Sequence, residues 1–190
     1  MIGRVLLVFL SALAVLVPWR AYAQGLPSGI GDFSAWYNVA TAAARNETDG
    51  VRAQLIAGKT PDITDDTGQN PLGYAASFGN VEMAQILIKY NAPVDRRDQF
   101  GNAPLHWAAQ RGSVEIVQLL IDAKATIDAQ NKQGVTPLMM AASRGQAAAI
   151  RLLLKHGADP QKRDYTGRDA MGWADGKPAA LQALRAAKPG

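Results

Sequence analysis

Histidines, serines and carboxylates are the side chains of this sequence that could carry out catalysis or hold a metal. His106 and His156 are its two histidines, and they lie 50 residues apart without cysteine or carboxylate partners at metal-ligand spacing. The serines of the central region stand in no nucleophile-elbow motif, and they are Ser77, Ser113 and Ser143. Asp65 and Asp66 fall in a turn-rich stretch, where Asp is favoured for its hydrogen bonds to the backbone. We therefore expect no enzymatic activity, no metal and no cofactor.

The composition excludes further classes of protein. Of the 190 residues, 48% are hydrophobic and 19% are charged, which is typical of a globular protein. The absence of cysteine rules out disulfides, Cys-ligated zinc and thiol catalysis. The net charge of +4 is slight and no block of Lys and Arg occurs, so we expect no nucleic-acid partner.

The first 23 residues have the layout of a secretory signal peptide. Arg4 precedes the apolar run Val5–Val17, Pro18 follows it, and Ala21-Tyr22-Ala23 supplies a small-x-small cleavage site. An uncleaved anchor is the alternative, but a run of 13 residues is short of the roughly 20 needed to span a bilayer. No twin-arginine pair precedes the run, which favours Sec-type export of an unfolded chain.

Cleavage after Ala23 would release a chain that begins at Gln24 and keeps no stable membrane anchor. Removing Arg4 and Arg20 from the 20 basic residues leaves 18 against 16 acidic ones. We expect a periplasmic or secreted protein. Abundant alanine, more Arg than Lys and the lack of cysteine favour a bacterial periplasm.

The same residues return every 33 positions in the rest of the chain. Glycine recurs at Gly68, Gly101, Gly134 and Gly167, and proline at Pro71, Pro104 and Pro137. Alanine pairs recur at Ala75-Ala76, Ala108-Ala109 and Ala141-Ala142. A fixed period of this length is typical of a solenoid, in which each repeat packs on its neighbours.

The repeats carry the short motifs NPLGYA (70–75), APLHWA (103–108) and TPLMMA (136–141). They resemble the T-P-L-H-x-A signature of the ankyrin repeat family. The resemblance implies an all-α solenoid of helix–turn–helix repeats with β-turn or hairpin tips. It also implies that His106 makes a local hydrogen bond that stiffens its turn.

The register divides the chain into a signal peptide, a leader and five repeats. These are 1–23, the Gly- and Pro-rich leader 24–32, a degenerate first repeat 33–64, the regular repeats 65–97, 98–130 and 131–163, and a C-terminal cap 164–190. End repeats depart from the pattern because one of their faces meets water. We expect Trp36 and Tyr37 to cover the exposed end of the core, with an aromatic binding patch as the alternative.

The central repeat illustrates the expected local structure. Asp98 and Gly101 are the favoured first and fourth residues of a type I turn. A first helix is predicted over Ala103–Gln110, ending at Gly112, and Ser113 is the predicted N-cap of a second helix. Asn80 takes the capping place in the preceding repeat, and Gln146 is a weaker cap in the next. The predicted buried stripe of the second helix contains Ile116, Val117, Leu119, Leu120 and Ile121.

The resemblance implies that the tips and first helices form a concave face that binds a protein partner. One column on this face contains Tyr74, Trp107, Met140 and Trp173, and a second contains Phe78, Arg111, Arg144 and Lys177. The tips add Phe100 and Tyr165. Trp, Tyr and Arg are enriched at binding hot spots, but the first column could equally be core and the second a solvated edge.

We interpret the chain as a non-catalytic, monomeric scaffold for protein binding outside the cytoplasm. A protective, chaperone-like or immunity factor for another exported protein would use the same surface and is the alternative. The sequence does not identify the partner.

Overall fold

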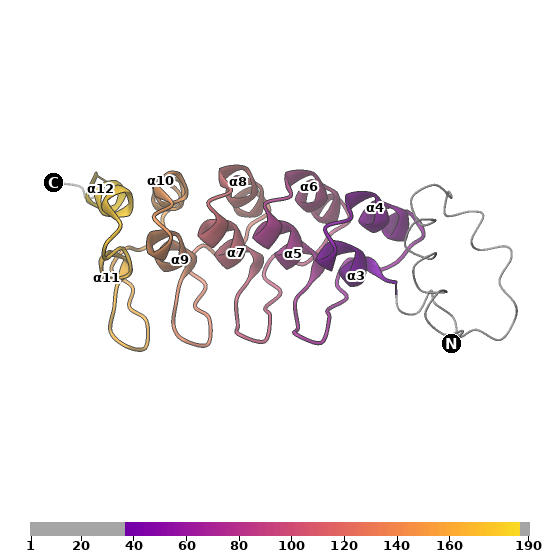
Figure 1. Ribbon diagram of the computed structural model, residues 1–190, viewed down its shortest axis with the longest axis horizontal. Helices are drawn as coiled ribbons and strands as arrows, with labels where there is room; N and C mark the ends of the chain where they lie inside the picture. Colours follow the sequence, from indigo (N-terminus) through magenta and orange to yellow (C-terminus); the bar gives the residue numbers. More distant parts are fainter. Residues whose placement is uncertain (1–36, 187–190) are drawn as a thin grey trace, which may run out of the picture. The chain divides into compact units, whose positions relative to one another are not determined.

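The computed structural model describes residues 37–186, in which ten α-helices follow one another and no strand occurs (Figure 1). The helices are α3 (Val39–Ala44), α4 (Thr48–Ile56), α5 (Pro71–Phe78), α6 (Val81–Lys89), α7 (Pro104–Arg111), α8 (Val114–Asp122), α9 (Pro137–Ser143), α10 (Ala147–Lys155), α11 (Ala170–Trp173) and α12 (Pro178–Ala186). They form consecutive pairs, and each pair lies beside the next, as the predicted all-α solenoid requires (Figure 1). The expected signal peptide, the leader and Trp36 lie outside the described residues.

Each tip is a β-turn held by the side chain that opens it. In the central repeat, the Gly101 N–H donates to the Asp98 carbonyl over 2.9 Å, which is the hydrogen bond of a β-turn at the predicted place. Asp98 Oδ1 accepts from the N–H groups of Phe100 and Asn102 at 2.8 and 2.9 Å. The equivalent residues Asp65, Asn131 and Asp164 accept in the same pattern. In each of these four repeats, the side chain that opens the tip thus accepts two backbone hydrogen bonds that hold the turn.

Gly101 meets two demands at the tip. Its φ is +82°, a left-handed conformation that strains a residue with a Cβ. A Cβ at this position would also lie 2.8 Å from the backbone nitrogen of Lys132 in the next repeat. That nitrogen donates to the Phe100 carbonyl over 3.0 Å, so Gly101 lets adjacent tips approach closely enough to bond.

The first helices begin and end close to the predicted residues. α7 starts at Pro104 and ends at Arg111, one residue later at each end than predicted, and Gly112 caps it with φ +79°. His106 Nδ1 accepts from the Ala103 N–H at 3.1 Å, which is the expected local bond. Its Nε2 therefore carries the proton and donates to the Val135 carbonyl, 3.1 Å away in the next repeat. His106 thus links two repeats as well as stiffening its own turn.

The capping of the second helices agrees with the sequence at Asn80 and differs at Ser113. Asn80 Oδ1 accepts from the Met83 N–H at 2.9 Å, and its Nδ2 donates to Asn46 and Thr48 of the preceding repeat. Ser113 occupies the N-cap position of α8, but its side chain makes no capping bond. Ser113 has a single hydroxyl, whereas Asn80 has a second polar group, its Nδ2, that holds it against the preceding repeat. Gln146 does not cap either.

The core runs through all the repeats as columns of fully buried side chains. Leu72, Leu105 and Leu138 come from the first helices, and Leu87, Leu120 and Leu153 from the second. The alanine pairs at 75–76, 108–109 and 141–142 are also fully buried between neighbouring first helices. Their small side chains allow those helices to approach closely.

The predicted buried stripe of α8 is wrong at Leu119, which is partly exposed. Ile116, Val117, Leu120 and Ile121 are buried and form one face. At 100° per residue, Leu119 lies roughly 130° from the centre of that face.

At the N-terminal end of the described residues, Tyr37 is half-buried against the core, and its hydroxyl donates to Glu47 over 2.5 Å.

Candidate functional site

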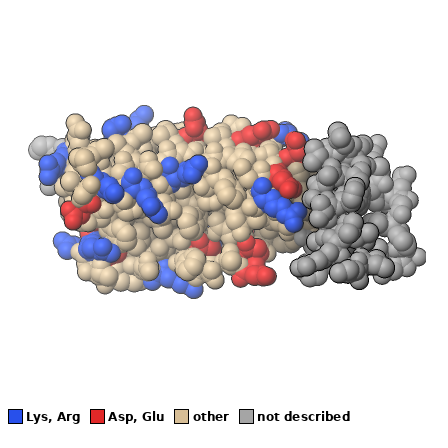
Figure 2. Space-filling model, viewed as in Figure 1, with Lys and Arg blue, Asp and Glu red and all other residues tan. Residues whose placement is uncertain are grey.

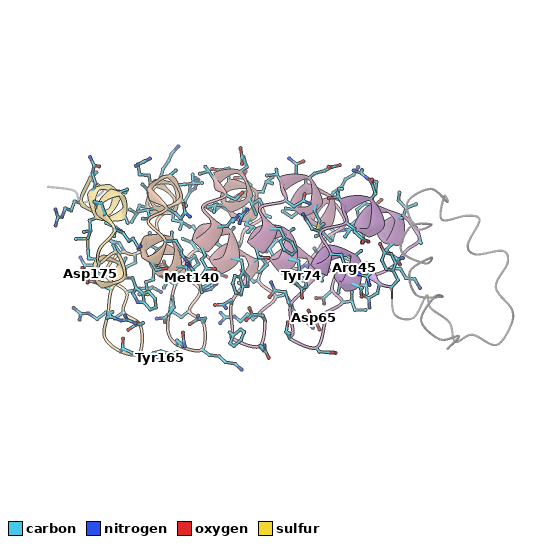
Figure 3. The ribbon with its side chains drawn as sticks, viewed as in Figure 1. Arg45, Asp65, Tyr74, Met140, Tyr165 and Asp175 are labelled. Carbon is cyan, nitrogen blue, oxygen red and sulfur yellow. The ribbon has the colours of Figure 1, made fainter. Side chains whose placement is uncertain are left out.

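The aromatic side chains of the first column are tied to the turn of their own repeat. Trp107 Nε1 donates to Asp98 Oδ2 at 3.1 Å, and Trp173 Nε1 donates to Asp164 Oδ2 at 2.9 Å. The Tyr74 hydroxyl donates to Asp65 Oδ2 in the same way, from α5 to the tip below it (Figure 3). We call this bond between the aromatic side chain and the Asp nine residues before it the turn latch. The latch holds each half-buried ring in one orientation.

The third regular repeat has lost both halves of the latch together. Asn131 stands in place of the Asp, and Met140 in place of the aromatic residue. Methionine has no N–H or O–H to donate, and the Asn131 Nδ2 group donates to Asn102 at 2.8 Å instead. The repeat without the aromatic donor is therefore also the repeat without the Asp.

The latch contributes to shifted pKa values of Tyr74, Asp65 and Asp164. Desolvation and the hydrogen bond to Asp65 raise the pKa of Tyr74 to about 12. Desolvation alone would raise the pKa of Asp164, but donors from Thr166, Arg168 and Trp173 outweigh it and lower that pKa to about 2. Arg168 also lies 4.2 Å above the Trp173 ring. These Asp side chains are therefore engaged as charged acceptors within the fold.

A double-mutant cycle measures the latch of the central repeat. Asp98→Asn keeps the Oδ1 acceptor of the turn, as Asn131 does, while Trp107→Phe removes the indole donor. We expect a coupling free energy of about 1–2 kcal/mol in urea unfolding, because the hydrogen bond is to a charged group. Asn131→Ala with Met140→Ala is the control cycle and should give a coupling near zero. Equal couplings in the two cycles would contradict the latch.

Two grooves flank Trp107 on the surface made by the tips and the exposed side of the first helices, which we call the first-helix face. One groove, of about 440 Å³, is lined by Ser77, Trp107, Gln110, Arg111, Arg144 and Gln146. The other, of about 290 Å³, is lined by Thr67, Gln69, Tyr74, Ser77, Asp98, Gln99, Phe100 and Trp107. We call them the arginine groove and the aromatic groove. Trp107 and Ser77 belong to both, so the grooves adjoin.

The basic side chains of this face extend further than the sequence reasoning found. Arg45, at the end of α3, is exposed and stands one period before Phe78, so the column contains Arg45, Phe78, Arg111, Arg144 and Lys177. The 33-residue register could have revealed it, but the degenerate first repeat hid the alignment. In Figure 2, several Lys and Arg side chains lie across the middle of the visible face, and others lie at its upper and lower edges. Among residues 37–186, Arg111 and Arg144 have no ion-pair partner.

Comparison with protein families decides the identity of this architecture. A model described as ankyrin repeats (3 copies) matches residues 40–131 and 123–188. The chain belongs to the ankyrin repeat family. A search of curated proteins gives no significant match. Ankyrin repeats generally mediate protein–protein interaction and are typically non-catalytic modules.

Within this ankyrin fold, the predicted site residues separate into groups. Tyr74, Phe100 and Trp107 come together in the aromatic groove, and Trp107, Arg111 and Arg144 in the arginine groove. Phe78 is 40% exposed and its ring stacks on Tyr74, with centroids 6.1 Å apart. The remaining predicted residues, Met140, Tyr165 and Trp173, line neither groove.

The first column is therefore both core and surface. Tyr74, Trp107, Met140 and Trp173 are all half-buried and pack against the core. Phe100 and Tyr165, on the tips, are 59% and 74% exposed. Sequence reasoning missed the role of Gln146, whose amide donates to the Gln110 and Arg111 carbonyls and forms one wall of the arginine groove.

Other chemistry finds little support in the ankyrin unit. Residues 37–186 contain no cluster of His, Asp and Glu side chains that could hold a metal ion. None of the described helices combines the length and apolar character needed to cross a membrane. His106 is fully buried, which keeps it from any substrate.

Proposed function

We propose that this chain is an exported, non-catalytic scaffold that binds a protein partner through its first-helix face and tips. The observation that carries the proposal is the pair of adjoining grooves around Trp107. They combine fixed aromatic rings with exposed arginines that have no ion-pair partner within residues 37–186. Aromatic residues and Arg dominate binding hot spots because they bury large contact areas and donate several hydrogen bonds.

Capture of the partner from the native compartment tests the surface. Arg111→Ala/Arg144→Ala should reduce the captured partner by about tenfold or more, since hot-spot residues each contribute upwards of 1 kcal/mol. Arg151→Ala/Lys155→Ala is the matched control, because it removes two exposed cations from α10 on the second-helix side. Each variant must retain the helical circular-dichroism spectrum. Loss of the partner in the control with retention in the groove variant would place the working surface on the second helices.

Export is the second component of the proposal. It is supported by the sequence pattern of residues 1–23, an apolar run between Arg4 and a small-x-small site. We expect protein from the cell envelope to have the intact mass of a chain that begins at Gln24. A species that retains Met1 and fractionates with membranes would refute cleavage.

A further inference from the structure

The charge of the arginine groove is unbalanced. Of the six side chains that line it, Arg111 and Arg144 are cationic and none is acidic. Both are exposed. Arg111 lies across the preceding repeat, with its Nε 3.4 Å from the place of a Cβ at Gly79. The absence of a side chain at Gly79 leaves room for the guanidinium at the groove wall.

Three other donors of this groove, those of Gln146, Ser77 and Trp107, are already engaged within the protein. The Gln146 amide donates to the carbonyls of Gln110 and Arg111 at 3.3 and 3.2 Å. The Ser77 hydroxyl donates to the Tyr74 carbonyl at 2.9 Å. The two guanidinium groups and the Gln110 amide are thus the donors left for a ligand, and only the guanidinium groups are charged. Their planar forks match carboxylates in bidentate geometry.

Trp107 joins this cationic site to an aromatic one. Its N–H is engaged by Asp98, so the indole offers a ligand its ring and no free donor. The adjoining aromatic groove adds Tyr74 and the exposed Phe100. A ligand that crosses Trp107 therefore meets arginines on one side and aromatic rings on the other.

We propose, on the basis of the proposed function, that the partner presents an acidic segment to this face. Its carboxylate side chains bind Arg111 and Arg144, and an adjacent aromatic or apolar side chain packs on Trp107 towards Phe100. Charge complementarity supports the carboxylates, and the fixed rings support the apolar neighbour.

A protein segment fits this surface better than a nucleic acid. Phosphate backbones are bound by a continuous track of cations, since affinity grows with each neutralised phosphate. Here Phe78 interrupts the basic column between Arg45 and Arg111. Asp98 lines the aromatic groove, where it would repel a second phosphate.

The test uses the full protein, labelled with ¹⁵N, and short blocked peptides. The indole N–H resonance of Trp107 is assigned by its absence in Trp107→Phe. A peptide with Glu residues around one Phe should shift this resonance, whereas the same peptide with Gln for Glu should bind at least about tenfold more weakly. Raising NaCl from about 50 to about 300 mM should weaken the acidic peptide several-fold, because exposed charges are screened.

Two variants locate the contact. Arg111→Ala/Arg144→Ala should weaken the acidic peptide by about tenfold or more, and Arg151→Ala/Lys155→Ala should leave its affinity unchanged. Three results would each overturn the proposal. They are equal binding of the Gln and Glu peptides, tighter binding of a single-stranded oligothymidylate than of the acidic peptide, and an unchanged affinity of the acidic peptide for Arg111→Ala/Arg144→Ala.

The two proposals fail separately. If the native partner is lost from the groove variant but the acidic peptide does not bind, the surface stands and the partner chemistry is wrong. If the acidic peptide binds as expected but the Arg111→Ala/Arg144→Ala variant still captures the native partner, the chemistry of the groove stands. Its role as the partner site is then refuted.

Discussion

Leu120→Ala is expected to lower the free energy of unfolding by about 2–5 kcal/mol, the range for truncating a fully buried leucine. Leu120 is 0% exposed on α8, which packs between α6 and α10. Truncation removes contacts with both neighbouring repeats and leaves a cavity that the flanking helices cannot fill without shifting. Urea unfolding followed by circular dichroism gives the measurement.

Two leucines serve as controls for this prediction. Leu184 is 3% exposed, but it lies on α12 in the last described repeat, which has one neighbouring repeat among the described residues. Leu184→Ala should therefore cost clearly less than Leu120→Ala. Leu119→Ala should cost least, because this side chain is partly exposed on the far side of α8. Similar losses for all three would mean that stability does not depend on position in the stack.

Stability is expected to fall by about 3 kcal/mol between pH 6.5 and pH 4 through His106. Burial lowers the pKa of His106 to about 4, against 6.5 for an exposed histidine. The unfolded chain therefore binds the proton in this range while the folded chain does not. Stability is present above pH 6.5 and is lost as the pH falls towards the folded pKa.

Desolvation by burial is the main cause of this pKa shift, and the positive charge of Arg97 adds to it. Beyond desolvation, a proton on Nδ1 would face the Ala103 N–H that Nδ1 now accepts. His106→Met is the control, since Met139 occupies the same position of the next repeat and is fully buried there. This variant should be less stable near neutral pH, having lost two hydrogen bonds, and its stability should change much less between pH 6.5 and 4.

The carboxylates do not obscure the effect of His106 on stability. They titrate at other pH values or contribute equally to wild type and to the His106→Met variant. The lowered pKa values of Asp65 and Asp164 contribute stability that is lost as the pH falls below their unfolded value near 3.8. Desolvation raises the pKa of Asp128, which acts in the opposite direction in wild type and variant alike. Unfolding curves at intervals from pH 7 to pH 4 isolate the histidine. If stability changes with pH in parallel for wild type and His106→Met, the assignment of the pH dependence to His106 is refuted.

The local structure followed from the sequence because its determinants act within one repeat. Asp98 at the start of a turn, Gly101 at its fourth place and Pro104 at a helix start each act on backbone groups a few residues away. Because the same turn and helix-start residues recur every 33 positions, these individually weak signals support one another. The core columns followed from helical spacing, and the exception at Leu119 arose because an unbroken apolar run does not show which residues face inwards.

The candidate site could be predicted only in part. The register placed Trp107, Arg111 and Arg144 on one face, and the structure brings them together around one groove. The register could not show that the Arg97 guanidinium donates to the Gln130 carbonyl at 2.6 Å while the Arg111 guanidinium stays available to a ligand. Arg97 ends one repeat and Arg111 lies in the next, and each has neighbours that come from other repeats.

By itself, the sequence determined the repeat, its turns, its helices and most of the residues on each face. Only the tertiary structure decided which polar groups are engaged between repeats, as in the bond from Arg97 to the Gln130 carbonyl and that from His106 to Val135. The physical reason is that hydrogen bonds require donor and acceptor within about 3 Å. Such distances across repeats depend on the offset between stacked helices, which side-chain packing sets and no pattern within one repeat encodes.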